Sequence, residues 1–144
     1  MEAIRYRKVD HSDLFTLKHI RDNVRENALV SLRIDLEDYE RAMFKDGTGW
    51  VCEVDGKVVG FVCGRLVQGD IWALFLDAKF EGRGIGNQLM QLIETWMFSQ
   101  GLDTIVLSTD PGTRAQRLYE RRGWKNAGLN EGGELRFSSA SALA

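Results

Sequence analysis

A glycine-rich segment directly before an amphipathic helix constrains the fold of this chain more than any other feature. Gly82, Gly84 and Gly86 fall within five residues. From Ile85 to Met97 apolar residues recur at helical spacing, and Gly101 follows as a helix end. The amides of such a loop, together with the positive end of the helix dipole, suit a phosphate or a pyrophosphate. A tight strand-to-helix turn without a ligand would use the same glycines, so the loop alone does not decide between the two.

Two common phosphate-binding motifs do not fit this segment. A dinucleotide fingerprint needs a third spaced glycine, and Leu89 occupies that position. A P-loop ends in Gly-Lys-Ser or Gly-Lys-Thr, which the segment lacks. Both motifs also belong to βαβ units, whereas the strands predicted before this loop form an antiparallel meander. We therefore expect neither a Rossmann domain nor a nucleoside triphosphate site.

The meander consists of three strands with turn residues between them. Asp55-Gly56 favours a two-residue hairpin turn between Trp50–Val54 and Lys57–Leu66, and Gln68-Gly69-Asp70 leads into Ile71–Asp77. Elsewhere the patterns predict strands at Ile4–Val9, Thr104–Thr109, Trp124–Ala127 and Glu134–Ser138. They predict helices at Asp13–Asp22, with Ser12 as N-cap, from Asp35 to Asp46, and from Ala115 to Gly123. Residues 25–34 are interpreted as a loop or a broken helix.

Length and charge limit the classes of protein that fit. With 144 residues the chain can bury one core, and we assign residues 1–138 to a single domain and residues 139–144 to a frayed tail. The formal net charge of -2 gives no general field for nucleic acid. No apolar run reaches the roughly 18 residues of a membrane helix, and the charged start lacks the apolar part of a signal peptide. We expect a cytoplasmic protein with no nucleic-acid or membrane partner.

The few cysteines and histidines argue against several other chemistries. Cys52 and Cys63 fall on the predicted hairpin about 13 Å apart, too far for a disulfide, and are interpreted as core residues. His11 and His19 are both near the N-terminus and no Gly-x-Ser-x-Gly is present, so a hydrolase triad has no support. No metal site is expected, because no ligands cluster at zinc spacing.

The glycine segment resembles a motif of a known family. Residues 81–86 resemble the acyl-CoA signature Gln/Arg-x-x-Gly-x-Gly/Ala of the GNAT superfamily, with Gly84 and Gly86 at the glycine positions. Glu81 stands where the family has Gln or Arg. Its negative charge would not assist a pyrophosphate, so binding would depend more on amides and on Arg83.

A second segment resembles the same family. Residues 115–124 match its Ala-x-x-x-Tyr-x-x-x-Gly-Phe/Trp pattern, with Tyr119 at the tyrosine. Gly112 occupies the place where many members have an Asn that contacts the cofactor. Both segments follow predicted strands, in the order that the family requires.

The resemblance implies a fold and a cofactor. The fold is α/β of the α+β type, a central, mixed, mostly antiparallel twisted sheet of about six or seven strands flanked by about four helices. Acetyl-CoA is the expected co-substrate, with a small-molecule or peptide amine as acceptor. The strand before the loop would pair its backbone with pantetheine, and the loop would hold the pyrophosphate. The residues expected at acetyl-CoA are Leu74, Phe75, Leu76, Gly82, Arg83, Gly84, Ile85, Gly86 and Asn87.

The resemblance also implies catalytic roles. Tyr119 is expected to protonate the departing CoA thiolate, with a tyrosine packed in the core as the alternative. A base is also needed, because amines are mostly protonated near neutral pH. Asp70 matches the position of the glutamate base in the histone-acetylating branch, with a plain turn aspartate as the alternative, and Glu53 is a second candidate. Period-two geometry predicts one shared face for Asp70, Trp72, Leu74 and Leu76.

We therefore predict an N-acetyltransferase in which the amine attacks the bound thioester directly, with no covalent enzyme intermediate. A GNAT-fold module that binds acyl-CoA or a protein without turnover is the alternative that Glu81 and Gly112 leave open. Homodimerisation through the late strands is a further hypothesis. The helices before the meander would choose the acceptor, and nothing in their sequence names it.

Overall fold

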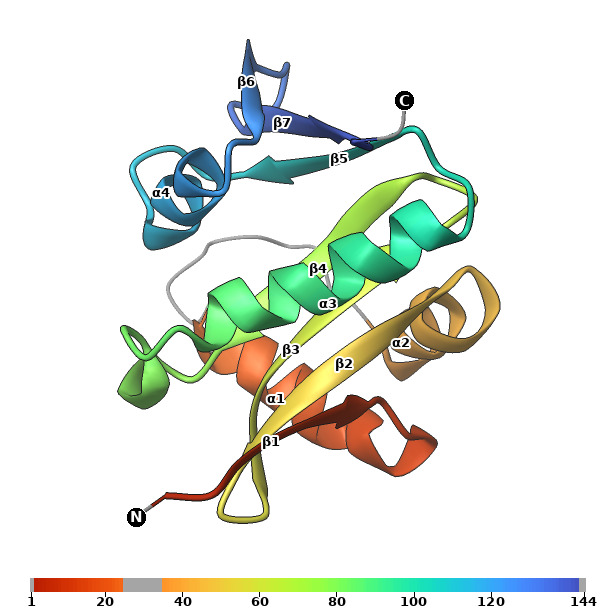
Figure 1. Cartoon of the computed structure of the whole chain (residues 1–144). Coiled ribbons are helices and arrows are strands. Elements are labelled where there is room, and N and C mark those ends of the chain that lie inside the picture. The colour runs from red at the N-terminus through yellow and green to blue at the C-terminus, as the bar shows by residue number, and fades with distance from the viewer. Residues whose placement is uncertain (1, 25–34, 143–144) are drawn as a thin grey trace.

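Seven strands form a single sheet in the computed structural model, which describes residues 2–24 and 35–142 (Figure 1). The strands are β1 (Ile4–Lys8), β2 (Gly47–Val54), β3 (Lys57–Arg65), β4 (Asp70–Leu76), β5 (Thr104–Thr109), β6 (Lys125–Leu129) and β7 (Leu135–Ala140). The helices are α1 (Leu14–Val24), α2 (Leu36–Glu40), α3 (Ile85–Ser99) and α4 (Arg114–Arg121). The loop or broken helix predicted at residues 25–34 lies outside the described residues.

The strand order determines where the sheet can open. The order is β1-β2-β3-β4-β5-β7-β6, and every neighbouring pair is antiparallel except β4 and β5. This confirms the expected mixed, mostly antiparallel sheet with four helices in the described part of the chain. β4 and β5 pair only at Asp70 and Val106, next to a 3.0 Å hydrogen bond from the Val106 N–H to the Gly69 carbonyl. Beyond this contact the two strands diverge.

Helices cover both faces of the sheet (Figure 1). Helix α3 packs on one face, and α1 and α2 pack on the other. Gly64 of β3 permits the close approach of α3, because a Cβ there would lie 2.5 Å from the Met97 sulfur. On the other face, Leu17 of α1 and Tyr39 of α2 are fully buried. The α3 face is filled by Ile85, Leu89, Met90, Ile93 and Met97, and all of these except Met90 belong to the periodic positions predicted from the sequence.

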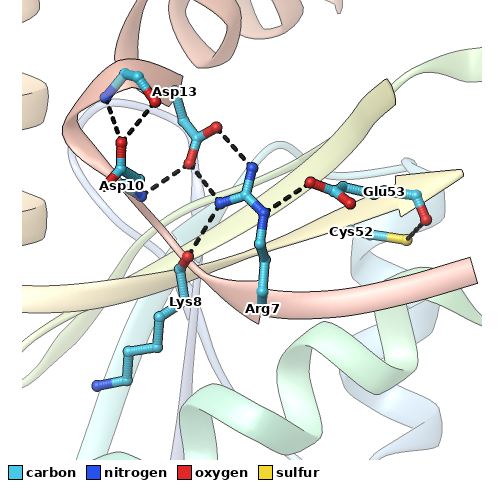
Figure 2. Close-up of polar contacts among 7 residues, drawn as sticks. Arg7, Lys8, Asp10, Asp13, Cys52 and Glu53 are labelled. Carbon is cyan, nitrogen blue, oxygen red and sulfur yellow. Dashed lines mark hydrogen bonds and ion pairs between the residues drawn. The ribbon is translucent and has the colours of Figure 1, made fainter. Parts of the chain in front are cut away.

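The start of α1 differs from the prediction. The N-cap is Asp10 rather than Ser12: its carboxylate accepts from the Ser12 backbone N–H at 2.9 Å (Figure 2). The Asp10 backbone N–H in turn donates to the Asp13 carboxylate at 2.8 Å. This reciprocal pair encloses a short 3-10 turn at His11–Asp13, so α1 begins at Leu14.

Other boundaries also differ. The second predicted helix is α2 followed by a π-helical turn at Arg41–Lys45. The last strand extends beyond residue 138, because Ser139 and Ala140 pair with β5, so these two residues do not belong to the frayed tail that was expected there. Cys52 and Cys63 are buried and unlinked, as expected. Within residues 2–24 and 35–142, no helix is long and apolar enough to cross a membrane.

Candidate active site

The divergence of β4 and β5 opens a cleft of about 1110 Å³. Its walls come from β4, β5, the glycine loop and α4. Segments far apart in the sequence therefore meet in one place. Ten of the site residues predicted from the sequence line this cleft: Asp70, Leu74, Phe75, Leu76, Gly82, Gly84, Ile85, Gly86, Asn87 and Tyr119.

The glycine loop presents an open backbone to the cleft. Gly82 and Gly84 have φ angles of 77° and 81°, a region that strains residues with a Cβ. Gly84 is the N-cap of α3, and no side chain caps this end of the helix. A Cβ on Gly84 would meet nothing within 4 Å, so the space beside it is open. The first amides of this 15-residue helix, with the positive end of its dipole, suit a phosphate group.

The arginine beside the loop is Arg114 rather than Arg83. Arg83 does not line the cleft, because its guanidinium is ion-paired with Glu2 and lies over the Phe80 ring, 5.0 Å from the centroid. Arg114, the first residue of α4, does line the cleft. Its Nε lies 3.1 Å from Oε2 of Glu81. Glu81, the acidic residue where the family motif has Gln or Arg, is therefore ion-paired with an arginine from α4.

A bulge in β4 changes which side chains reach each face of the sheet. The register between β3 and β4 shifts at Cys63 and Gly64, and Trp72 is left without a partner on β3. Leu74 and Leu76 pack against the core under α3, whereas Trp72 packs against the core under α1 and α2. The prediction that Trp72 shares a face with these leucines is therefore wrong, because an extra residue reverses the alternation. A bulge also frees backbone groups from the ladder, here on a strand that borders the cleft.

Tyr119 lines the cleft with only 5% of its surface exposed. Its ring packs against Trp124 and Phe137, with centroids 6.0 and 5.8 Å away. Burial raises the pKa of Tyr119 well above its ordinary value of 10.0, because the charged tyrosinate is poorly solvated there. The hydroxyl therefore stays protonated near neutral pH, the state that a proton donor needs.

The two candidate carboxylates lie in different places. Asp70 lines the cleft where β4 meets β5, and Arg65 donates to its two oxygens at 2.9 and 2.6 Å. Glu53 of β2 does not line the cleft and accepts from the Arg7 Nε at 2.7 Å (Figure 2). Arg7 also donates to both oxygens of Asp13, at 2.8 Å each. Glu53 thus belongs to a cluster that ties β1, β2 and the start of α1 together, and only Asp70 is placed for chemistry in the cleft.

Arg21 of α1 also lines the cleft, although it was not among the site residues predicted from the sequence. Its Cζ lies 5.4 Å from the centroid of the Trp72 ring and 4.9 Å from that of Phe75. One sequence signal pointed to it. Arg21 comes four residues after Leu17, which is fully buried, so it lies on the core-facing side of the helix.

Comparison with known proteins decides the family. The model of the acetyltransferase (GNAT) family matches residues 16–124. The chain belongs to the GNAT acetyltransferase family. Among curated GNAT-related proteins, the N-acetylaspartate synthetase of Xenopus tropicalis is 31% identical over 108 residues, which cover 70% of this chain and 40% of that protein. This chain therefore spans less than half the length of that relative.

Solved structures of N-acetyltransferases share the GNAT fold seen here. An N-acetyltransferase from Staphylococcus aureus Mu50 superposes with a TM-score of 0.82 at 20% identity, covering 96% of this chain and 98% of that one. The PaiA N-acetyltransferase of Thermoplasma acidophilum, solved in complex with coenzyme A, has a TM-score of 0.75 at 16% identity, covering 96% and 99%. The acyl donor of the GNAT family is acetyl-CoA. The uncapped start of α3 and the diverging edge of β4 are features of this chain that fit it.

Proposed function

We propose that this chain transfers the acetyl group of acetyl-CoA to a primary amine of a small molecule or peptide within a ternary complex. One observation carries the proposal: an uncapped helix start, the diverging edge of β4 and the buried Tyr119 all border the same cleft. The first two suit binding of the donor, and the third suits the chemistry. The named activity of the curated relatives, N-acetylaspartate synthesis, is of the same class.

Binding of acetyl-CoA uses backbone more than side chains. Residues 74–76 of β4 lie along the strand edge that diverges from β5, and their backbone groups suit the amides of pantetheine. The amides of residues 82–87 take the pyrophosphate. Arg83 points away from the cleft, so Arg114 is the arginine that supplies charge to the phosphates.

The chemistry needs one proton donor and one proton acceptor. The amine nitrogen bonds to the acetyl carbon while the bond from that carbon to the CoA sulfur breaks. Tyr119 donates a proton to the departing sulfur, and backbone groups on the edge of β4 that diverges from β5 polarise the carbonyl. The amine gives up one proton to an acceptor on the protein, and solvent returns one proton to Tyr119, so the products are an N-acetyl amide and free CoA.

Asp70 is the proposed acceptor of the amine proton, acting through water. Both of its oxygens accept from Arg65, but each carboxylate oxygen can accept more than one hydrogen bond. A water on Asp70 is therefore compatible with the ion pair. Arg65 keeps the carboxylate oriented at the closed end of the cleft, where β4 and β5 meet.

Calorimetric titration with acetyl-CoA and with CoA tests donor binding without knowledge of the acceptor. Saturable binding of both is expected. A screen of amines for CoA thiol release then tests turnover. Absence of binding at high concentration would mean that the glycine loop is only a structural turn, and would refute the proposal. Binding of acetyl-CoA without turnover of any amine would favour the alternative, a module that only binds acyl-CoA.

Replacement of Tyr119 by Phe tests the proton donor. The ring contacts with Trp124 and Phe137 are kept, so the fold and the affinity for CoA should change little. We expect kcat to fall by about a hundredfold. Because the pKa of Tyr119 is raised above its ordinary value of 10.0, deprotonation of this hydroxyl should not lower the wild-type kcat at any pH below 10.0. An unchanged kcat in Tyr119→Phe would show that the tyrosine only packs in the core and is not the proton donor.

We also propose a cytoplasmic homodimer. The edge strand β6 supports a homodimer, because all five of its residues are exposed and its outer edge can pair with another chain. The mass of the purified protein in solution tests this, and a monomer at micromolar concentration would contradict it.

A further inference from the structure

The acceptor side of the cleft carries a cation on α1. Arg21 lines the cleft and is partly buried, next to Trp72 and Phe75 of β4. It belongs to the face of the sheet covered by α1 and α2, whereas the glycine loop leads into α3 on the opposite face. Arg21 is therefore placed away from the site proposed for the CoA pyrophosphate.

Two aromatic rings hold the guanidinium in place. The Cζ of Arg21 is 5.4 Å from the Trp72 centroid and 4.9 Å from the Phe75 centroid, within the range of cation–π contacts. A guanidinium carries five N–H donors, so it can contact rings and donate to a planar anion at the same time.

The platform beneath Arg21 is itself fixed. The ring of Tyr39 stands edge-on to Trp72, with centroids 5.1 Å apart and an interplanar angle of 86°. Tyr39 has no exposed surface, and desolvation raises its pKa to about 12 against the opposing charge of Arg21. Trp72 is also the bulged residue of β4. Arg21 is thus held beside the part of β4 that borders the cleft where the acyl group is proposed to lie.

We propose that Arg21 binds a carboxylate of the acceptor, and that the acceptor is an amino acid or another small amine that carries a carboxylate. The inference rests on the proposed acetyl transfer. A planar guanidinium matches a carboxylate with two parallel hydrogen bonds, and a fixed guanidinium loses little freedom on binding. The contact orients the acceptor so that its amine reaches the acyl group from the α1 face, opposite the face on which α3 holds the donor.

Paired acceptors test the charge requirement in the wild-type protein. Each amino acid is compared with its carboxamide, in the presence of acetyl-CoA, by CoA thiol release. The carboxamide has the less basic amine and so the larger neutral fraction, which would favour it if charge recognition were absent. We expect kcat/KM to be about ten- to a hundredfold higher for the best carboxylate than for its amide. Equal rates, or better rates with carboxylate-free amines or peptides, overturn the inference.

Replacement of Arg21 by Met tests the residue. Methionine keeps an apolar stem against Trp72 and Phe75 and removes the charge. We expect KM for the carboxylate acceptor to rise about ten- to a hundredfold with a smaller change in kcat, and little change for the matched amide. Lys18→Met, on the same helix and paired with Asp22 at 2.8 Å, is the control and should keep both values. Equal losses on acid and amide would mean that Arg21 only supports the fold.

Failure of this inference is distinguishable from failure of the proposed function. Acetyl-CoA binding by wild type and Arg21→Met is measured first, and loss of binding in wild type would remove the function itself. If acetyl-CoA binds but no amine is acetylated, titration of the CoA complex with N-acetyl amino acids and their amides measures carboxylate binding directly. Tighter binding of the acids by wild type but not by Arg21→Met supports the site, and equal binding overturns it.

Discussion

At the scale of single residues, the most unusual feature is the pairing of Glu81 with Arg114. Glu81 replaces a neutral or basic residue of the family signature, and its carboxylate lies 3.1 Å from the Arg114 guanidinium. Both side chains line the cleft, Glu81 before α3 and Arg114 at the start of α4. A phosphate at the glycine loop would compete with Glu81 for this arginine. If the loop holds the pyrophosphate as proposed, Glu81 would weaken donor binding in two ways, by its own charge and by holding Arg114.

Glu81→Gln should bind CoA more tightly. The change removes the negative charge and leaves Arg114 to the phosphates, and because both side chains are substantially exposed the gain should be a few-fold, corresponding to at most about 1 kcal/mol. Titration calorimetry at low and moderate salt measures it, and the advantage should shrink as salt screens the charges. Glu120→Gln, on α4 and outside the lining of the cleft, is the control. Weaker binding by Glu81→Gln would show that the carboxylate helps to organise the loop.

The residues found from the sequence share one property: each belongs to a local pattern. Gly84 and Tyr119 occur in motifs whose spacing is fixed along the chain, and both line the cleft. Arg83 belonged to a motif too, but the direction of its side chain depends on Glu2, far away in sequence. Arg21 has no motif, and its role emerges only when α1 is placed against β4. Local sequence patterns could not predict the partners of these arginines, because tertiary packing brings those partners together.

At the scale of elements, periodicity predicted α3 well and β4 less well. Four of the predicted apolar positions of α3, Ile85, Leu89, Ile93 and Met97, are buried against the sheet, because a regular helix keeps its spacing along its whole length, whereas Leu92 and Trp96 are only partly buried. The alternation of β4 fails at Trp72, since one bulged residue moves every later side chain to the other face. Nothing local in the sequence marks this bulge. As a result Trp72 lies next to Arg21 on a strand that borders the cleft.

Gly84→Val should abolish tight CoA binding. The space beside Gly84 is open, so the added side chain would occupy the position proposed for the pyrophosphate, and the φ of 81° adds strain of about 1 to 3 kcal/mol. We expect affinity for CoA to fall at least about tenfold, from the loss of charge-assisted amide contacts. Gly123→Val is the matched control, with a φ of 83° and equally open surroundings but no place in the lining of the cleft.

The two glycine variants separate strain from blockage. Both should lower the midpoint of urea unfolding by similar amounts, because the backbone conformation is the same. Only Gly84→Val should lose CoA binding. Loss of binding in both would mean that strain alone weakens the site, and normal binding in both would place the pyrophosphate elsewhere.

At the scale of the whole molecule, the cleft divides the sheet into two parts. One part contains β1 to β4, and the other contains β5, β7 and β6. Along the sheet they are joined by a single pair, Asp70 with Val106. A second connection runs between α3 and α4, where Arg122 donates to both oxygens of Glu94 at 2.8 Å each and the Trp124 indole N–H donates to Glu94 at 3.0 Å. We therefore expect this cluster to help set the distance between the two walls of the cleft.

Glu94→Ala should therefore destabilise the protein and weaken donor binding together. The side chains of Arg122 and Glu94 are only 10% and 15% exposed, and removal of Glu94 leaves Arg122 with the neutral oxygens of Asn87 and Gln91 and no opposing charge, and the Trp124 N–H without its acceptor. We expect a loss of about 3 kcal/mol in the free energy of unfolding, measured in urea as one transition because the two parts share a core. Lys18→Met, which breaks an exposed pair, should cost at most about 0.5 kcal/mol. If Glu94→Ala loses stability but keeps full affinity for CoA, the donor itself bridges the two walls. If it loses no more stability than the control, the shared apolar core alone sets the width of the cleft.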